Sequence, residues 1–277
     1  MSSSTNGSAA RVSNPLMSDD FARVYEETAH RITVPVSLAA LDAVGGIGVG
    51  SRVLDIAAGA GALSLPAAER GADVVAVDVA PGMVKRLAAK LVGFATCEAR
   101  VGDGEMLDLP EGSFDATFSI FGVMTFADWR KGLNEQARMT RPRGKGCVVT
   151  WHEPPGGGPF QILFAALRTV FPDRPAPPWP EGFAALSDPD RLTDEMTKAG
   201  FAEVIVQQIE AVWEGPVGQA YLDEMRELHQ YVRPYMALDD DHRARVNDAI
   251  RTLTTERAVD GKMRLTSPVL IAVGVRT

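Results

Sequence analysis

The sequence predicts an α/β protein with a mostly parallel sheet that is covered by helices on both faces. Strand-like and helix-like segments alternate from Arg52 to Trp151, which is typical of βαβ units. Hydrophobic residues make up 45% of the 277 residues, enough for a sizeable core in one large domain or two small ones. Intrinsic disorder as the main state is therefore excluded.

The first 50 residues are expected to form a leader followed by helices. Residues 1–17 are small and polar and lack an apolar h-region, which predicts a disordered leader rather than a signal peptide. Residues 18–50 are expected to form the N-terminal helices. The first is capped by Ser18 and carries apolar residues at intervals of three and four as far as Ile32, and a second helical stretch covers residues 36–44.

The alternating part of the chain follows. Its expected segments are strand 52–56, helix 62–69, strand 73–77, helix 81–91, strands 98–101 and 114–120, helix 129–139 and strand 146–151.

The alternation stops after Trp151. Eight of the 18 prolines lie between residues 154 and 180, so we expect an insertion at 154–187 that carries one helix, with an apolar stripe that includes Phe160 and Phe164. Beyond it we expect a capped helix from Asp188 to Gly200, a strand at 203–213, helices at 216–232 and 239–256 within a second insertion at 215–258, and a last strand at 264–275.

Charge and cysteine content limit the partners and the compartment. The formal net charge of −8 disfavours nucleic acid as a partner. Cys97 and Cys147 are too few for a disulfide framework, which indicates a reducing, cytoplasmic setting. No apolar run reaches transmembrane length, so no membrane insertion is expected. The acidic runs 19–20 and 239–241 begin helices, where the helix dipole explains them, and we expect no metal site.

A glycine-rich turn is the first candidate binding site. Gly59 and Gly61 follow the strand that contains Asp55, and Asp78 ends the next strand. Glycines at such a turn let a ligand approach the backbone, and an acid at the end of the next strand can accept both hydroxyls of a ribose. The turn alone also fits a dinucleotide site with Ser64 at the third glycine position, or a tight turn that serves packing only.

Two acidic features distinguish these interpretations. Asp55 lies before the glycines, where it would repel a pyrophosphate but hold an ammonium group, which favours a ligand with a cationic head. A second acidic cluster, residues 102–105, follows the third strand and places a carboxylate within reach of an exocyclic amine such as that of adenine.

With these residues the chain resembles the class I S-adenosylmethionine-dependent methyltransferases of the small-molecule type, similar to the ubiquinone/menaquinone biosynthesis methyltransferases. The matching segments are VLDIAAGAG, VDVAPGMV, GDGEMLDLP, SFDATFSIFGVMTF, ARMTRPRGKGCVVTW and LSDPDRLTDEMTKAGFAEV. The resemblance implies a Rossmann-like seven-stranded sheet of order 3-2-1-4-5-7-6, with the last strand antiparallel. It implies one methyltransferase domain over residues 51–277, with the two insertions as a helical cap at the carboxyl edge of the sheet.

The resemblance also implies S-adenosyl-L-methionine as the cofactor and a set of residues that bind it. Asp55, Gly59 and Gly61 would hold the methionine part, and Asp78 the ribose hydroxyls. Ala57 stands where many members have a glycine, and its methyl group is expected to be tolerated if φ stays negative. The remaining cofactor residues are Val79 and Met83 beside the adenine, Asp103, Gly104 and Glu105 at its edge, and Phe121 on the apolar side.

Methyl transfer is an in-line displacement that depends on positioning, so a general base is optional. His152 is the candidate catalytic residue, as a base or acceptor-orienting group, with capping of its loop as the alternative. The candidate substrate-binding residues are Tyr25, His30, Met124, Trp151, Trp179, Tyr221 and His229. For Tyr25, Tyr221 and His229, core packing is the default alternative.

The sequence thus predicts a methyltransferase that methylates an O, N or C atom of a small, partly apolar molecule. Two alternatives stay open: an NAD(P)-dependent oxidoreductase, and a non-catalytic binding protein with a methyltransferase fold. The expected partner is the small-molecule acceptor, and a homodimer is left open. The acceptor itself is not revealed, because the resemblance fades beyond Val206.

Overall fold

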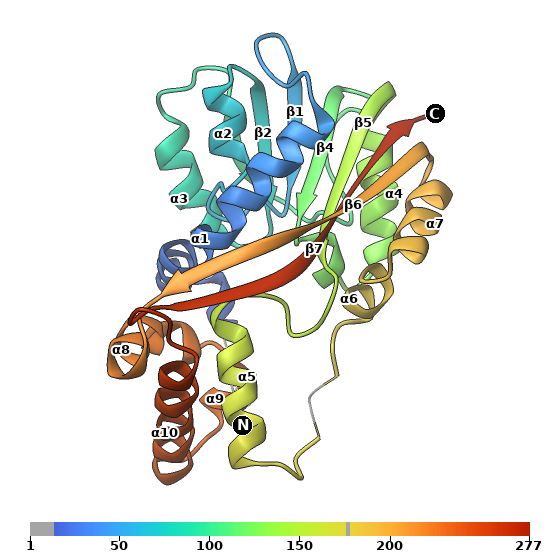
Figure 1. Ribbon diagram of the computed structural model, residues 1–277. Helices are drawn as coiled ribbons and strands as arrows, with labels where there is room; N and C mark the ends of the chain where they lie inside the picture. The colour runs from blue at the N-terminus through green and yellow to red at the C-terminus, as the bar shows by residue number, and fades with distance from the viewer. Residues whose placement is uncertain (1–13, 176–177) are drawn as a thin grey trace, which may run out of the picture.

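The computed structural model describes residues 14–175 and 178–277. Its centre is a seven-stranded sheet of order β3-β2-β1-β4-β5-β7-β6 (Figure 1). β7 pairs antiparallel with β5 and β6, and the other neighbours pair in parallel, which confirms the predicted order and the antiparallel last strand. The strands are β1 (Arg52–Ile56), β2 (Asp73–Asp78), β3 (Glu98–Val101), β4 (Phe114–Ile120), β5 (Thr140–Trp151), β6 (Phe201–Gly215) and β7 (Met263–Arg276).

The helices fill the intervals as the sequence predicts, except that the insertion at 154–187 carries two helices where one is expected, and a short extra helix follows residue 232. They are α1 (Asp19–Val44), α2 (Ser64–Glu69), α3 (Pro81–Leu91), α4 (Trp129–Met139), α5 (Pro159–Val170), α6 (Glu181–Leu186), α7 (Pro189–Ala199), α8 (Gly218–His229), α9 (Arg233–Met236) and α10 (Asp240–Glu256). None of the described helices is both long and apolar enough to cross a lipid bilayer.

The N-terminal region differs from its prediction in one respect. The two expected helical stretches form a single helix, α1, which runs through Pro35. Proline removes one intrahelical hydrogen bond, but Pro35 lies on the exposed face, where water can satisfy the freed carbonyl. Ser18 caps the helix as predicted, since its hydroxyl accepts the amide of Phe21 at 3.1 Å. The predicted leader lies outside the described residues as far as residue 13, and Pro15–Met17 form a short 3₁₀ turn.

Both faces of the central strands are buried. Val53 and Leu54 are adjacent in β1 and fully buried, yet they belong to different hydrophobic clusters, because successive side chains of a strand point to opposite faces. The cluster of Val53 includes residues of α1, α3, α5 and the C-terminal helices. The cluster of Leu54 includes Met139 at the end of α4.

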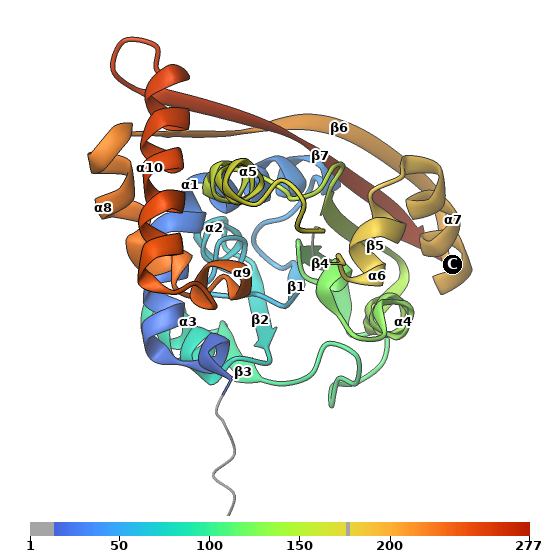
Figure 2. The same ribbon diagram turned by 90° about the horizontal axis from the view of Figure 1, so that it is seen from below.

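The two insertions lie beyond the carboxyl ends of the parallel strands. In Figures 1 and 2, α5 extends away from the sheet and runs beside α9 and α10, while the long strands β6 and β7 reach toward α8. α10 packs against both α5 and α8, and α1 contacts α8. A helical layer therefore stands next to the strand ends where open α/β sheets bind their ligands.

Candidate active site

The turn after β1 has an unusual backbone. Ala57, Gly59 and Gly61 have φ values of 61°, 55° and 98°. At Gly61 a Cβ atom would lie 2.4 Å from Cδ1 of Leu87, so both conformation and space require glycine there. The condition for tolerating the methyl group of Ala57, a negative φ, is not met: the residue lies in the left-handed region, at a cost of about 1–2 kcal/mol for a residue with a Cβ.

Asp78 ties this turn to the end of β2. Its Oδ2 accepts the amide of Gly59 and its Oδ1 the amide of Ala80, each at 2.8 Å. Burial raises the pKa of Asp78, and the two amide donors oppose that rise. The carboxyl group is thus fixed at the carboxyl edge of the sheet, next to the glycine turn.

Asp55 is a buried carboxyl group without a cation. It is 1% exposed, and its Oδ2 accepts a hydrogen bond of 2.6 Å from the hydroxyl of Ser64. Burial raises its pKa to about 7; the Ser64 hydrogen bond opposes this rise and the nearby charge of Asp78 adds to it. Among the described residues, no lysine, arginine or histidine lies within ion-pair distance of Asp55. The geometry provides a buried negative charge that a cationic ligand would stabilise.

A cavity, here called the turn cavity, lies between this turn and α1. Its walls include Asp55, Ala57 and Gly59 from the turn and Tyr25 and His30 from α1. Burial raises the pKa of Tyr25, to which the charge of Asp78 adds, and burial lowers that of His30. Both side chains therefore favour their neutral forms. The remaining lining residues are Thr33, Ala58, Ala60, Ala62, Leu63 and Ile120.

A second cavity, the aromatic cavity, adjoins the first, because Tyr25 and Thr33 line both. The rings of Phe121 and Trp151 stack on one another in its wall, with centroids 4.3 Å apart and planes 15° apart. Its other lining residues are Thr28, Ala29, Ile32, Gly157, Pro159, Phe160 and Leu228. Tyr25 is the one titratable side chain among these, so the cavity is apolar.

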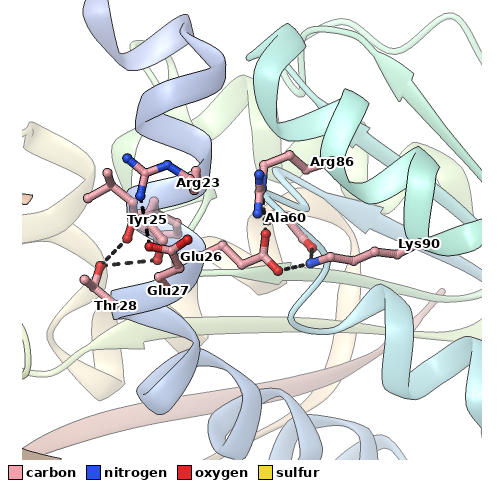
Figure 3. Close-up of polar contacts among 9 residues, drawn as sticks. Arg23, Tyr25, Glu26, Glu27, Thr28, Ala60, Arg86 and Lys90 are labelled. Carbon is pink, nitrogen blue, oxygen red and sulfur yellow. Dashed lines mark hydrogen bonds and ion pairs between the residues drawn. The ribbon is translucent and has the colours of Figure 1, made fainter.

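Glu26 fixes α1 over the glycine turn. Its carboxylate pairs with Arg86 at 2.6 Å and with Lys90, both on α3, and Lys90 also donates to the carbonyl of Ala60 at 3.3 Å (Figure 3). Burial alone would raise the pKa of Glu26, but the two cations outweigh it and hold the pKa below its usual range. Glu26 is not among the residues predicted from the sequence, because nothing in the spacing of α1 and α3 reveals which side chains meet.

The residues expected around the adenine lie apart from the turn cavity. Val79 is 57% exposed, whereas Met83 is buried against Ala80 and Tyr25. The exposed Asp103 accepts the amide of Glu105 at 2.9 Å. The Glu105 carboxylate accepts the amide of Asp128 at 3.0 Å, and Gly104 is buried beside Phe126. All of the expected adenine residues follow β2 or β3 at the carboxyl edge of the sheet.

The predicted catalytic residue, His152, lines neither cavity. Its Nδ1 is 2.6 Å from the carbonyl oxygen of Ser187, and its backbone amide donates to Pro268. These hydrogen bonds match the alternative that His152 caps its loop. The catalytic role of His152 stays a prediction.

The predicted substrate residues divide into two groups. Tyr25, His30 and Trp151 line the cavities, and Trp179 lies farther out, against Phe164. The others are buried in the core: Met124 is 1% exposed, the hydroxyl of Tyr221 donates to Pro159, and neither ring nitrogen of His229 has a partner among the described residues.

The matching family model and two sequence relatives with named activities are methyltransferases. Residues 54–148 match the family described as "Methyltransferase domain". The demethylmenaquinone methyltransferase of Beutenbergia cavernae is 38% identical over 162 residues, which cover 56% of this chain and 64% of that protein. The chain thus spans less than two thirds of this relative. The nocamycin O-methyltransferase of Saccharothrix syringae is 30% identical and aligns over 92% of this chain and 96% of its own length.

A solved structure shows the same fold. The phosphoethanolamine N-methyltransferase 2 of Haemonchus contortus, in complex with phosphomonomethylethanolamine and S-adenosylhomocysteine, aligns with a TM-score of 0.57 at 17% identity. The alignment covers 95% of this chain and 58% of that one.

Proposed function

The chain belongs to the class I S-adenosylmethionine-dependent methyltransferases, and from this premise we propose that it methylates an O, N or C atom of a small, partly apolar molecule. The observation that carries the proposal is the buried Asp55, which has no cation beside it and stands in the wall of a cavity bounded by a glycine turn. S-Adenosyl-L-methionine is a cation with an ammonium head and, when bound, supplies a methyl group on a sulfonium.

The residues of the turn cavity fit this cofactor. Asp55 would hold the ammonium group, and Gly59 leaves the backbone open, since a Cβ there would meet nothing within 4 Å. Asp78 would bind the ribose hydroxyls at the edge of the same turn. His30 and Tyr25 close the cavity from α1 as neutral groups and add no positive charge that would repel the ligand.

The acceptor would lie in the aromatic cavity, where Trp151, Phe121 and Phe160 exclude water. Orientation of reactants supplies roughly 7–11 kcal/mol of a barrier, whereas a general base contributes about 10²- to 10⁴-fold in rate. We therefore assign catalysis mainly to positioning and desolvation. Tyr25 would act as a hydrogen-bond donor, because its raised pKa keeps the phenol protonated. His30, as a neutral imidazole, could accept a proton from an acceptor that has to lose one.

The test is a screen of small-molecule acceptors in which release of S-adenosylhomocysteine is measured. We expect release with at least one partly apolar acceptor. Ala29→Phe adds bulk at a residue that lines the aromatic cavity and not the turn cavity, so it should abolish that release and leave the affinity for S-adenosylhomocysteine unchanged. Binding of S-adenosylhomocysteine with no turnover of any acceptor would favour the non-catalytic alternative.

The oxidoreductase alternative finds no support among the comparisons, whose named relatives are methyltransferases. Mass spectrometry of the cofactor that copurifies with the protein separates the two directly. A cytoplasmic location and a place in small-molecule biosynthesis remain part of the proposal, consistent with two free cysteines in the described residues.

A further inference from the structure

A third cavity, the outer cavity, lies farther along the helical layer. Its volume is about 230 Å³, against about 70 Å³ for the aromatic cavity. Its walls are apolar and include Phe164 and Leu167 on α5, Trp179, and Pro234 on α9. The edge of Phe164 meets the ring of Trp179, with centroids 5.4 Å apart.

The outer and aromatic cavities share two structural supports. The first is α5, on which Phe160 lines the aromatic cavity and Phe164, one turn later, lines the outer one. These residues are about 6 Å apart along the helix axis and on the same face. The second is the end of β5 with the loop that follows it, where Trp151 and Gly157 line the aromatic cavity and Pro154 lines the outer cavity. One apolar strip therefore borders both cavities.

Charge at the outer cavity is concentrated in two arginines. Arg168 and Arg174 line it and are exposed at its margin. Neither guanidinium has a carboxylate within ion-pair distance among the residues that the structure describes, in contrast to Arg86 or Arg138. Arg174 lies over the ring of Phe171, 5.1 Å from its centroid, which holds the cation against the apolar wall.

We propose that the methyl acceptor is an elongated amphipathic anion: its reacting end lies in the aromatic cavity, its apolar body in the outer cavity, and its acidic group against Arg168 and Arg174. This inference rests on the proposed function and specifies its substrate class. The aromatic cavity, at about 70 Å³, is far smaller than a usual ligand pocket, so a larger acceptor has to extend beyond it. From Phe160 to Arg168 the helix rises about 12 Å, which sets the distance between reacting end and acid.

The test measures binding without turnover, so that it is independent of the unknown acceptor. Decanoate, decyl phosphate and decanol are titrated against the full chain by calorimetry and by intrinsic tryptophan fluorescence, and Trp179→Phe should lose the part of the fluorescence change that comes from the outer cavity. We expect at least one of the two anions to bind at least tenfold more tightly than decanol, and the tighter one identifies carboxylate or phosphate as the preferred acid.

Substitution of the two arginines completes the test. The double variant Arg168→Gln, Arg174→Gln should lose this preference for the anion, whereas Arg191→Gln, an exposed arginine on α7, should keep it. Equal binding of anions and decanol, no binding of any probe, or equal effects of the double variant and Arg191→Gln would overturn the proposal. Binding of S-adenosylhomocysteine to wild type is measured in parallel. If wild type does not bind it, the proposed function fails; if wild type binds it but binds none of the probes, only this inference fails.

Discussion

The hydroxyl of Ser64 donates a 2.6 Å hydrogen bond to the buried carboxyl group of Asp55. In the sequence, Ser64 is a departure from the glycine pattern of dinucleotide-binding turns. In the structure it supports the acidic group that we assign to the cofactor's ammonium. Both residues are almost fully buried, so the pair forms part of the folded turn.

Affinity for S-adenosylhomocysteine is expected to depend on pH through Asp55. Its pKa of about 7 means that near pH 6 the free protein holds a largely neutral carboxyl, which has to lose its proton before it can pair with an ammonium group. The dissociation constant should therefore fall as pH rises from about 6 to 8, by up to about tenfold per pH unit on the acidic side. Asp55→Asn should bind more weakly and without this dependence. Calorimetry across this range is the measurement, and a flat profile in wild type would refute the assignment.

Asp55→Asn is also expected to stabilise the free protein. Burial raises the pKa of Asp55 from 3.8 in the unfolded chain to about 7 in the folded protein, so ionisation of this carboxyl group destabilises the fold. This destabilisation is absent below pH 3.8 and grows as pH rises toward 7. At pH 8 the variant should be more stable by roughly 2–4 kcal/mol. Chemical unfolding of both proteins at pH 4 and pH 8 tests this, and an equal difference at the two pH values would speak against it.

Ser64→Ala should shift the pH profile of binding. The Ser64 hydrogen bond lowers the pKa of Asp55, so its loss raises that pKa further and moves the rise in affinity to higher pH. Ser113→Ala serves as the control, because that hydroxyl bonds only to the carbonyl of Pro110 on the surface. A profile that moves to lower pH, or that moves equally in both variants, would contradict the role of Ser64.

Glu26→Gln should loosen α1 from the glycine turn. It removes the partner of Arg86 and Lys90, and partly buried pairs of this kind contribute about 1–3 kcal/mol. We expect faster hydrogen exchange in α1 and faster dissociation of S-adenosylhomocysteine. Glu27→Gln is the matched control, since Glu27 is exposed and pairs with Arg23 on the same helix. If the two variants behave alike, the Glu26 contact does not hold the site.

His229 is expected to make the protein sensitive to acid. Burial lowers its pKa from 6.5 to about 4, so below pH 6.5 the unfolded chain binds a proton that the folded protein resists. The free energy of unfolding is therefore unaffected by His229 above pH 6.5 and decreases as pH falls toward 4. The decrease is about 2 kcal/mol between pH 7 and pH 5. His229→Phe should remove this loss. Unfolding curves at both pH values decide, and an unchanged pH dependence in the variant would reject the explanation.

The grouping of residues around the glycine turn could be predicted because its signals are local. Asp55, Gly59 and Asp78 lie at the ends of strands β1 and β2 that are adjacent in the sheet, so short motifs place them together. The order of the strands could be predicted as well, because the order of the motifs along the chain resembles that of a known family. The positive φ of Ala57 could not be predicted, since an alanine at that position does not reveal which backbone region the turn imposes.

The acceptor half was predicted only in part, because its residues come from distant elements. Thr28, Phe160 and Leu228 belong to α1, α5 and α8 and meet only after the helical layer has packed. Tyr221 and His229 have the helical spacing of a pocket face, yet the same spacing serves the core, where the structure places them. Periodicity identifies an apolar face and leaves open what the face contacts.

Calorimetry of S-adenosylhomocysteine with wild type, Asp78→Ala and Asp73→Ala tests whether the glycine turn and the end of β2 bind the cofactor. Asp78 bonds to the glycine turn at the carboxyl end of β2, whereas Asp73 begins the same strand at the opposite end. We expect wild type and Asp73→Ala to bind equally and Asp78→Ala to bind at least about tenfold more weakly, because it loses hydrogen bonds to a charged group. Absence of binding by wild type, or equal binding by Asp78→Ala, would contradict this expectation.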